Sequence, residues 1–156
     1  MGLLFLSLLV GCGRAVTEAP PVTSSRGYPL ADLEIRRGGR VLLDLEVEVA
    51  DTPEARGRGL MGVRRLGQNG GMAFLVDAPS RSPFYMKDTL IPLDIAFWDG
   101  EGRIVDILQM LPCPAEPCPR YYPRNDYLGA VEVTFGLLGR RGVRIGDVAA
   151  LRRRQG

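Results

Sequence analysis

The sequence predicts a mainly β fold, either an antiparallel β-sandwich or a partly open barrel, with one or two short helices. Three observations lead to this prediction. Apolar and polar residues alternate over residues 42–49, as they do in a half-buried strand. Other strand-like segments recur at short spacing between turns rich in glycine. Strands and helices do not alternate regularly, which argues against a doubly wound sheet.

The first two strands are expected to form a hairpin. Residues 33–36 and the segment that begins at Val41 flank Arg37-Gly38-Gly39-Arg40, whose two glycines can adopt positive φ angles. Within residues 42–49, leucine and valine side chains fall on one face and acidic side chains on the other. We therefore expect these strands to pair antiparallel.

A helix signal follows the hairpin. Asp51 or Thr52 can cap a helix whose first residue is Pro53, a position where the missing amide hydrogen has no intrahelical partner to lose. The pattern predicts a short helix that runs to about residue 61, with Leu60 and Met61 in the core.

The remaining strands are predicted over residues 72–76, 93–98, 104–110 and 131–135, and a glycine-rich turn joins the second of these to the third. No internal repeat or second domain is evident. We expect one β-rich domain over residues 29–151, followed by a solvated basic tail at residues 152–156.

The first residues are typical of an export signal. Residues 3–10 form an apolar run that is far too short to span a bilayer. The run ends in Leu9-Val10-Gly11-Cys12, which resembles the bacterial lipobox, although no Lys or Arg precedes it. Residues 1–11 are therefore predicted to be a lipoprotein signal peptide, with Cys12 as the lipid-attachment residue. The alternative is that Cys12 is a buried thiol of an N-terminal strand.

Residues 12–28 are rich in proline, serine and threonine, so we expect them to form a flexible tether between the lipid and the domain. The expected location is the cell envelope, outside the cytoplasm, and the expected partner is the membrane through the anchor. An envelope ligand or a partner protein is a further expectation.

Composition excludes several functions. The chain has 20 basic and 18 acidic residues, so it lacks the charge footprint of a nucleic-acid-binding protein. It contains no histidine, which excludes Ser-His-Asp and Cys-His catalysis. Acid–base chemistry would depend on carboxylates, a cysteine, a tyrosine or Lys87. No motif indicates a cofactor or a metal.

Cys113 and Cys118 form a C-x₄-C pair between prolines. After export both thiols would lie in an oxidising compartment, so a local disulfide is the main interpretation. A redox-active pair is the alternative, but the spacing is not C-x-x-C. A zinc site would need two further ligands of the right kind.

Residues 84–97 contain the densest cluster of unlike side chains in the chain. They resemble the signature of the bacterial and archaeal family catalogued as domain of unknown function 192, a Trp-Met-Lys-Asn-Thr run followed by Pro-Leu-Asp. The resemblance includes Arg58-Gly59-Leu60-Met61 and covers about residues 42–150. Tyr85 and Asp88 stand where the family usually has tryptophan and asparagine. The resemblance implies a compact β-rich fold and frequent export, without an established activity.

The candidate site combines Lys87, Asp94 and Glu132, with Trp98 as an aromatic wall. Asp94 and Trp98 are predicted on the strand face opposite Leu93, Ile95 and Phe97. If Lys87, Asp94 and Glu132 converge, they could bind a polar ligand or act as the acid–base set of a hydrolase of envelope polymers. The alternative is a structural ion pair that fixes the loop over residues 86–92.

Tyr121 and Tyr122 follow the two cysteines, with Arg120 and Arg124 nearby. They could stack a sugar or a peptidoglycan fragment, or they could pack a loop against the sheet. The leading hypothesis is a binding protein without catalysis, and the hydrolase is the alternative.

Overall fold

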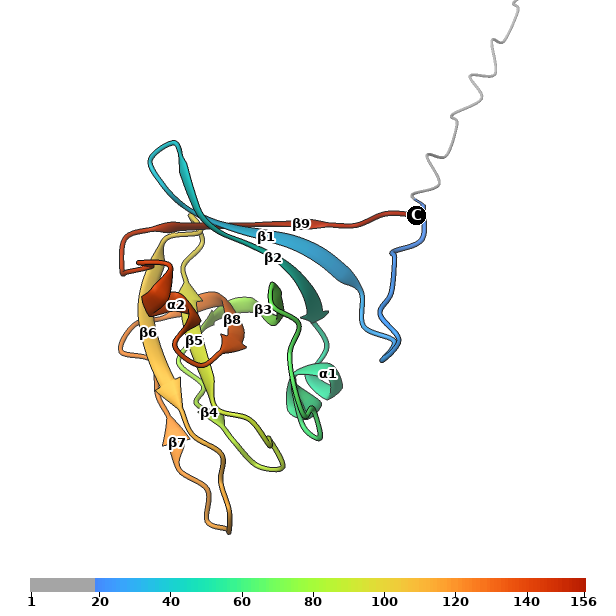
Figure 1. The fold of residues 1–156 in the computed structure, drawn as a ribbon, viewed down its shortest axis with the longest axis vertical. Helices are drawn as coiled ribbons and strands as arrows, with labels where there is room; N and C mark the ends of the chain where they lie inside the picture. Colours follow the sequence, from blue (N-terminus) through green and yellow to red (C-terminus); the bar gives the residue numbers. More distant parts are fainter. Residues whose placement is uncertain (1–18) are drawn as a thin grey trace, which may run out of the picture.

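The computed structural model describes residues 19–156 (Figure 1). The predicted signal peptide and Cys12 lie outside these residues. Nine strands and two short helices follow one another within residues 19–156. In order, they are β1 (Leu30–Arg37), β2 (Arg40–Ala50), α1 (Pro53–Arg58), β3 (Gly70–Ser80), β4 (Phe84–Tyr85), β5 (Leu93–Trp98), β6 (Ile104–Met110), β7 (Arg120–Tyr121), β8 (Tyr127–Thr134), α2 (Leu137–Arg140) and β9 (Val148–Arg153).

Seven of the strands form one sheet in the order β6-β5-β8-β3-β2-β1-β9, while β4 and β7 pair with each other. The prediction of a mainly β fold with short helices is confirmed. The sheet is mixed, however, because β2 and β3 pair in parallel, whereas the antiparallel prediction holds for the other neighbours. The parallel pair arises because α1 and residues 59–69 carry the chain back before β3 begins.

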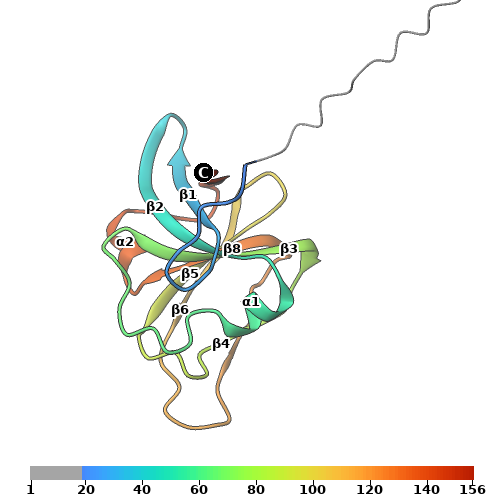
Figure 2. The same cartoon turned by 90° about the vertical axis from the view of Figure 1, so that its right-hand side faces the viewer.

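The sheet is strongly curved and forms a partly open barrel (Figures 1 and 2). Its edge strands β6 and β9 meet at one end, where Arg103 bridges to Val148 and the amide of Ile104 donates to the carbonyl of Asp147 at 2.7 Å. No ladder joins the two edges along their length in the described part of the chain, so the barrel is not closed.

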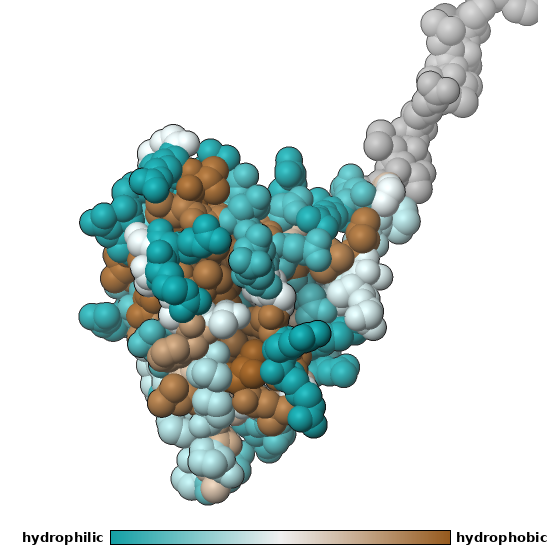
Figure 3. Space-filling view, in the orientation of Figure 1, coloured by the Kyte–Doolittle hydropathy of each residue, from teal (hydrophilic) through white to brown (hydrophobic). Residues whose placement is uncertain are grey.

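The curved sheet separates two hydrophobic cores. The inner core draws side chains from all seven strands of the sheet and from α2, and it includes Leu33, Ile35, Leu45, Val47, Ala96, Val131, Val133, Leu138 and Ala149, together with Ile104 and Trp98. The outer core lies on the other face, where β3, β5 and β8 meet Leu60 and β4, and it includes Met72, Phe74, Met86, Leu93, Ile95, Phe97 and Ala130. Figure 3 shows apolar residues gathering on the surface over the region where Figure 1 places α1 and β4.

The helix and its flanks differ slightly from the prediction. Thr52, and not Asp51, caps α1, since its hydroxyl accepts a hydrogen bond from the amide of Ala55 at 3.1 Å. The helix ends at Arg58 because Gly59 adopts a positive φ angle of 46°. Neither helix in residues 19–156 is long and apolar enough to cross a membrane.

Residues 19–28 and 152–156 are more ordered than the sequence suggests. The expected tether at residues 12–28 is attached over its described part, because Ser24 donates to Glu48 at 2.5 Å and the amide of Val22 donates to the carbonyl of Arg154 at 3.2 Å. The expected basic tail at residues 152–156 begins within β9, and Arg154 forms ion pairs with Asp32 and Glu46. Acidic side chains on neighbouring strands thus neutralise the arginine run.

Candidate functional site

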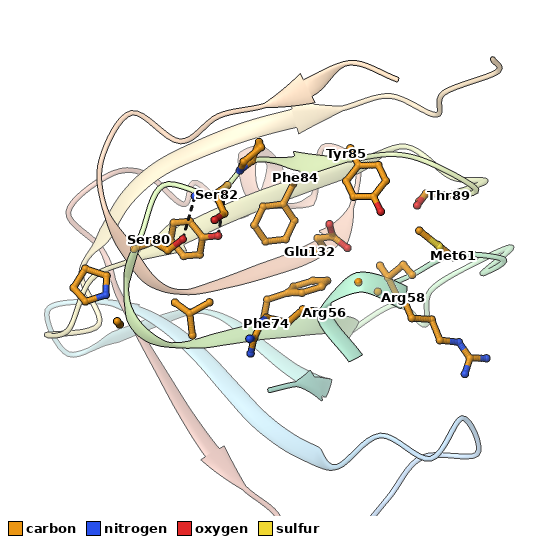
Figure 4. Close-up of a pocket in the computed structure, with 18 residues that line it drawn as sticks. Arg56, Arg58, Met61, Phe74, Ser80, Ser82, Phe84, Tyr85, Thr89 and Glu132 are labelled. Carbon is orange, nitrogen blue, oxygen red and sulfur yellow. Dashed lines mark hydrogen bonds between the residues drawn. The ribbon is translucent and has the colours of Figure 1, made fainter. Parts of the chain in front are cut away.

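A cavity of about 540 Å³ lies between the outer face of β3 and β8, the C-terminal end of α1 and the segment around β4 (Figure 4). Its volume is in the range of pockets that hold small organic ligands. The cavity is therefore the principal candidate site in the described part of the chain.

Aromatic rings form much of the cavity wall, and they come from three strands. Phe74 lies on β3, Phe84 and Tyr85 on β4, and Tyr127 on β8. The rings of Phe74 and Phe84 meet edge to face, with centroids 5.0 Å apart. The hydroxyl of Tyr127 donates to the carbonyl of Ser82 at 3.1 Å, which fixes its ring. Packed rings of this kind give the cavity a rigid apolar wall.

Glu132 is the one acidic residue among those that line the cavity. It lies in the middle of β8, opposite Met72 on β3 and Ile95 on β5, and only 5% of it is exposed. In Figure 4 its carboxyl group lies beside the rings of Phe74 and Phe84. Within residues 19–156 its side chain has neither a hydrogen bond nor an ion pair. Burial raises the pKa of Glu132 to about 8.

Asp94 lies on the opposite face of the sheet from Glu132. Ile95 is the direct partner of Glu132, and residues opposite each other in a ladder share a face. Asp94, one residue earlier, therefore points into the inner core. Its carboxylate accepts hydrogen bonds from the amide of Leu138 at 3.0 Å and from Gln109 at 3.2 Å. Asp94 thus caps the N-terminal end of α2, a structural role.

Lys87 is separate from both carboxylates. Its side chain is half exposed, and its ammonium lies 3.7 Å from Glu116 in the loop between the two cysteines. The structure does not bring Lys87, Asp94 and Glu132 together, because each has a different environment. The acid–base set that we considered for a hydrolase is therefore not assembled.

The aromatic candidates also lie outside the cavity lining. Trp98 is buried in the inner core, on the same side of β5 as Asp94. Tyr121 is half-buried, and its hydroxyl accepts a hydrogen bond from the amide of Leu111 at 3.1 Å. Tyr122 is 60% exposed. These three rings do not form one binding surface with Glu132.

Cys113 and Cys118 are joined by a disulfide, with their Cα atoms 5.5 Å apart. The bridge closes the loop that carries Glu116. No group of three or more potential metal-ligating side chains of His, Cys, Asp or Glu occurs within residues 19–156.

The segment 84–97 shapes one rim of the cavity. Met86 is buried in the outer core, and Thr89 is buried and lines the cavity. Asp88 adopts a positive φ angle of 53°, a conformation that asparagine and aspartate adopt more readily than most residues. The carbonyl of Asp88 accepts a hydrogen bond from the amide of Gly62 at 2.9 Å, which ties this rim to the segment after α1.

Sequence reasoning identified Glu132 but missed the walls around it. Phe74, Phe84 and Tyr127 come from strands that are far apart in the chain, and only the folded sheet brings them together. One local signal was available, because Glu132 is a lone charge between valines on an apolar strand.

Fold and site together define a small β-rich protein that has a ligand-sized cavity on the outer face of a partly open barrel. The chain belongs to the family described as uncharacterized ACR (DUF192), whose model matches residues 33–151. This confirms the resemblance in segment 84–97.

Two crystal structures are similar to this chain over most of its length. A protein of unknown function from Novosphingobium aromaticivorans is 26% identical with a TM-score of 0.76, and the match covers 90% of this chain and 99% of that one. A Sinorhizobium meliloti protein described as a candidate transcription regulator is 28% identical with a TM-score of 0.71, and the match covers 85% of this chain and 98% of that one. No curated protein matches the chain significantly.

Proposed function

We propose that this protein is an exported, lipid-anchored binding protein that takes a small organic ligand into the cavity around Glu132. The observation that carries the proposal is the carboxyl group of Glu132, which is buried at an aromatic-walled cavity without a hydrogen-bond partner in the described chain.

A buried polar group without a partner is costly. Leaving a fully inaccessible donor or acceptor unsatisfied destabilises a protein by about 1–3 kcal/mol, and by more when the group is charged. No side-chain oxygen within residues 19–156 is both inaccessible and without a hydrogen bond, so the carboxyl group of Glu132 reaches the open space of the cavity. Glu132 projects between Met72 and Ile95 on a face where apolar side chains pack well. A ligand could therefore supply the hydrogen-bond or ion-pair partner that the described chain does not provide. A carboxyl group that an otherwise apolar face presents to a cavity is what we expect of a binding site.

Binding without catalysis fits the lining of the cavity. The other titratable side chains there are Arg56, Arg58, Tyr85 and Tyr127, and none of them forms a hydrogen bond with Glu132. A hydrolase that works with an acid–base pair needs a second group placed to take or give the proton. Glu132 alone favours recognition of a ligand.

The location is proposed from the N-terminal sequence. The apolar run and the segment Leu9-Val10-Gly11-Cys12 favour export followed by lipid attachment at Cys12. Acyl chains contribute about 0.8 kcal/mol per buried CH₂, so two or three chains would hold the protein at a membrane. The protein would then bind its ligand in the cell envelope.

Binding in the cavity can be tested with Nile red, an uncharged dye whose emission increases in apolar surroundings. The wild type is expected to bind it saturably at one site. Val76 lines the cavity, so Val76→Trp should weaken this binding by at least about tenfold, a change of about 1.4 kcal/mol. The matched control is Val41→Trp, which adds the same ring at a valine that does not line the cavity. A wild type that does not bind the dye, or equal binding by Val76→Trp, would contradict the proposal.

The anchor is tested separately by labelling cells with a palmitate analogue. The wild type should incorporate the label, whereas Cys12→Ser should lose it and appear in the soluble envelope fraction. A Cys113→Ser/Cys118→Ser variant is the control for other thiols and should keep the label. Equal labelling of the wild type and Cys12→Ser would remove the anchor from the proposal and leave the cavity untouched.

A further inference from the structure

We propose that the ligand of this cavity is an organic cation, with a protonated amine against Glu132 and an apolar body against the aromatic wall that Phe74 and Phe84 form. The inference rests on the proposed function, since it names the ligand class for the same cavity.

The first argument is the combination of one carboxyl group with several aromatic rings. Glu132 lies beside Phe74 and Phe84 in Figure 4, and Tyr85 and Tyr127 complete the wall. The face of an aromatic ring carries partial negative charge and attracts an ammonium group within about 6 Å of its centre. The rings and the carboxylate therefore favour the same kind of ligand, a cation with apolar parts.

The second argument is that the protein supplies no cation to Glu132. Arg56 also lines the cavity, but its guanidinium donates to the carbonyls of Asp51 and Leu75, both at 2.8 Å. Arg58 is exposed, and in Figure 4 its side chain extends away from Glu132. Neither arginine forms an ion pair with Glu132 in residues 19–156. The position next to the carboxylate is thus available to a positive charge from outside.

The charges also argue against an anionic ligand. When Glu132 is ionised, such a ligand would bring a second negative charge beside it, while Arg56 is already bonded to backbone carbonyls. The remaining alternative is a neutral ligand that accepts a hydrogen bond from the protonated carboxyl group.

A cation and a neutral acceptor require opposite protonation states of Glu132. The cation needs the carboxylate, so its binding to the protonated form must release a proton, and its affinity must rise with pH. Because burial raises the pKa of Glu132 to about 8, the affinity for the cation should increase from pH 6.5 to pH 8.5. An amine such as 4-phenylbutylamine, with a pKa of about 10.4 like that of lysine, stays protonated over this range. Affinity for a neutral acceptor would fall over the same range. Burial raises the pKa of Tyr127 above its usual value, so Tyr127 stays protonated over this range.

The experiment compares three probes with the same body: 4-phenylbutylamine, 4-phenylbutanol and 4-phenylbutanoate. The affinity of each probe is measured by displacement of Nile red and by calorimetry, at pH 6.5 and pH 8.5. We expect the amine to bind at least about tenfold more tightly than the alcohol at pH 8.5, and the acid to bind least. The amine should gain at least about tenfold in affinity between the two pH values. In Glu132→Gln these differences should vanish while the alcohol still binds. Glu101→Gln, at a surface turn, is the matched control and should behave as the wild type does.

The outcomes separate this inference from the proposed function. If the alcohol binds as tightly as the amine, or if affinity for the amine does not rise with pH, the inference that the ligand is a cation is wrong. The proposal that the cavity binds a small organic ligand is then unaffected. If no probe displaces Nile red and the dye itself does not bind, the proposed function fails as well. The pH profile of the wild type decides the question even if Glu132→Gln does not fold.

Discussion

Asp94 and Glu132 are both buried and lie on adjacent strands, but they point to opposite faces of the sheet. Asp94 accepts hydrogen bonds from the amide of Leu138 and from Gln109, so the fold satisfies it. Glu132 has no such partner in the described chain, and it borders a cavity. The difference shows that burial alone does not distinguish a carboxylate that the fold satisfies from one that is presented to a cavity. The distinguishing observation is whether the fold itself provides the hydrogen-bond donors.

The two faces of the sheet also differ in how tightly their side chains pack. On the inner face, Gly129 lies so close to Trp98 that an added Cβ atom would be 2.3 Å from the indole ring. On the outer face, a cavity of about 540 Å³ stays open beside Phe74 and Phe84. The inner face is therefore built for stability, and the outer face leaves room for a ligand.

The largest effect should come from removing the charge of Glu132. Its pKa is raised to about 8 in the folded protein from a model value of 4.5, so the folded state keeps a proton that the unfolded state loses. Stability should therefore fall as pH rises from about 4.5 to 8. The loss should approach about 4 kcal/mol at pH 8. Glu132→Gln should not show this loss.

The measurement is urea unfolding of the wild type and Glu132→Gln at several pH values from 4 to 9. The advantage of the variant should grow across this range and level off above pH 8. Glu101→Gln, an exposed carboxylate, controls for general charge effects. A constant difference between the wild type and Glu132→Gln would mean that Glu132 titrates normally.

On the opposite face, Asp94→Ala should destabilise the protein by about 3 kcal/mol, because it leaves the amide of Leu138 buried without an acceptor. The readout is the free energy of unfolding in urea. Asp44→Ala removes an exposed carboxylate from β2 and should change stability by less than about 0.5 kcal/mol. If Asp94→Ala is as stable as Asp44→Ala, capping of α2 by Asp94 does not matter for folding. Nile red binding should be unchanged in the folded fraction of Asp94→Ala.

Local patterns predicted the main strands well. The alternation over residues 42–49 and the two glycines before it gave the β1–β2 hairpin, and the segments 93–98 and 104–110 match β5 and β6. These elements depend on periodicity and turn residues, which are visible within a short window. Strand β9 was missed because its arginines resemble a solvated tail, and the acidic partners Asp32 and Asp51 lie more than 100 residues away.

The site could be predicted only in part. Glu132 stands out in the sequence as a charge within an apolar strand, so it was named. Its grouping with Asp94 failed because the facing of two strands depends on register, and the pairing of Ile95 with Glu132 sends the carboxylates to opposite sides. Lys87 lies in the same sequence motif as Asp94 and forms only an exposed contact with Glu116. Lys87 and Asp94 are therefore close in the sequence but have separate environments in the structure.

The smallest of the three stability effects should come from crowding the inner face. Gly129→Ala would place a methyl group on the ring of Trp98, and relief of that clash should cost about 2 kcal/mol. Trp98 is the only tryptophan, so its emission reports on this contact and should shift to the red as the ring is displaced toward solvent. Gly39→Ala is the matched control, because Gly39 has no atom within 4 Å of an added Cβ, and it should alter neither stability nor emission appreciably. Unchanged emission and stability in Gly129→Ala would show that the inner face can accommodate the added methyl group. The contrast between a rigid inner face and an open outer face would then rest on Glu132 alone.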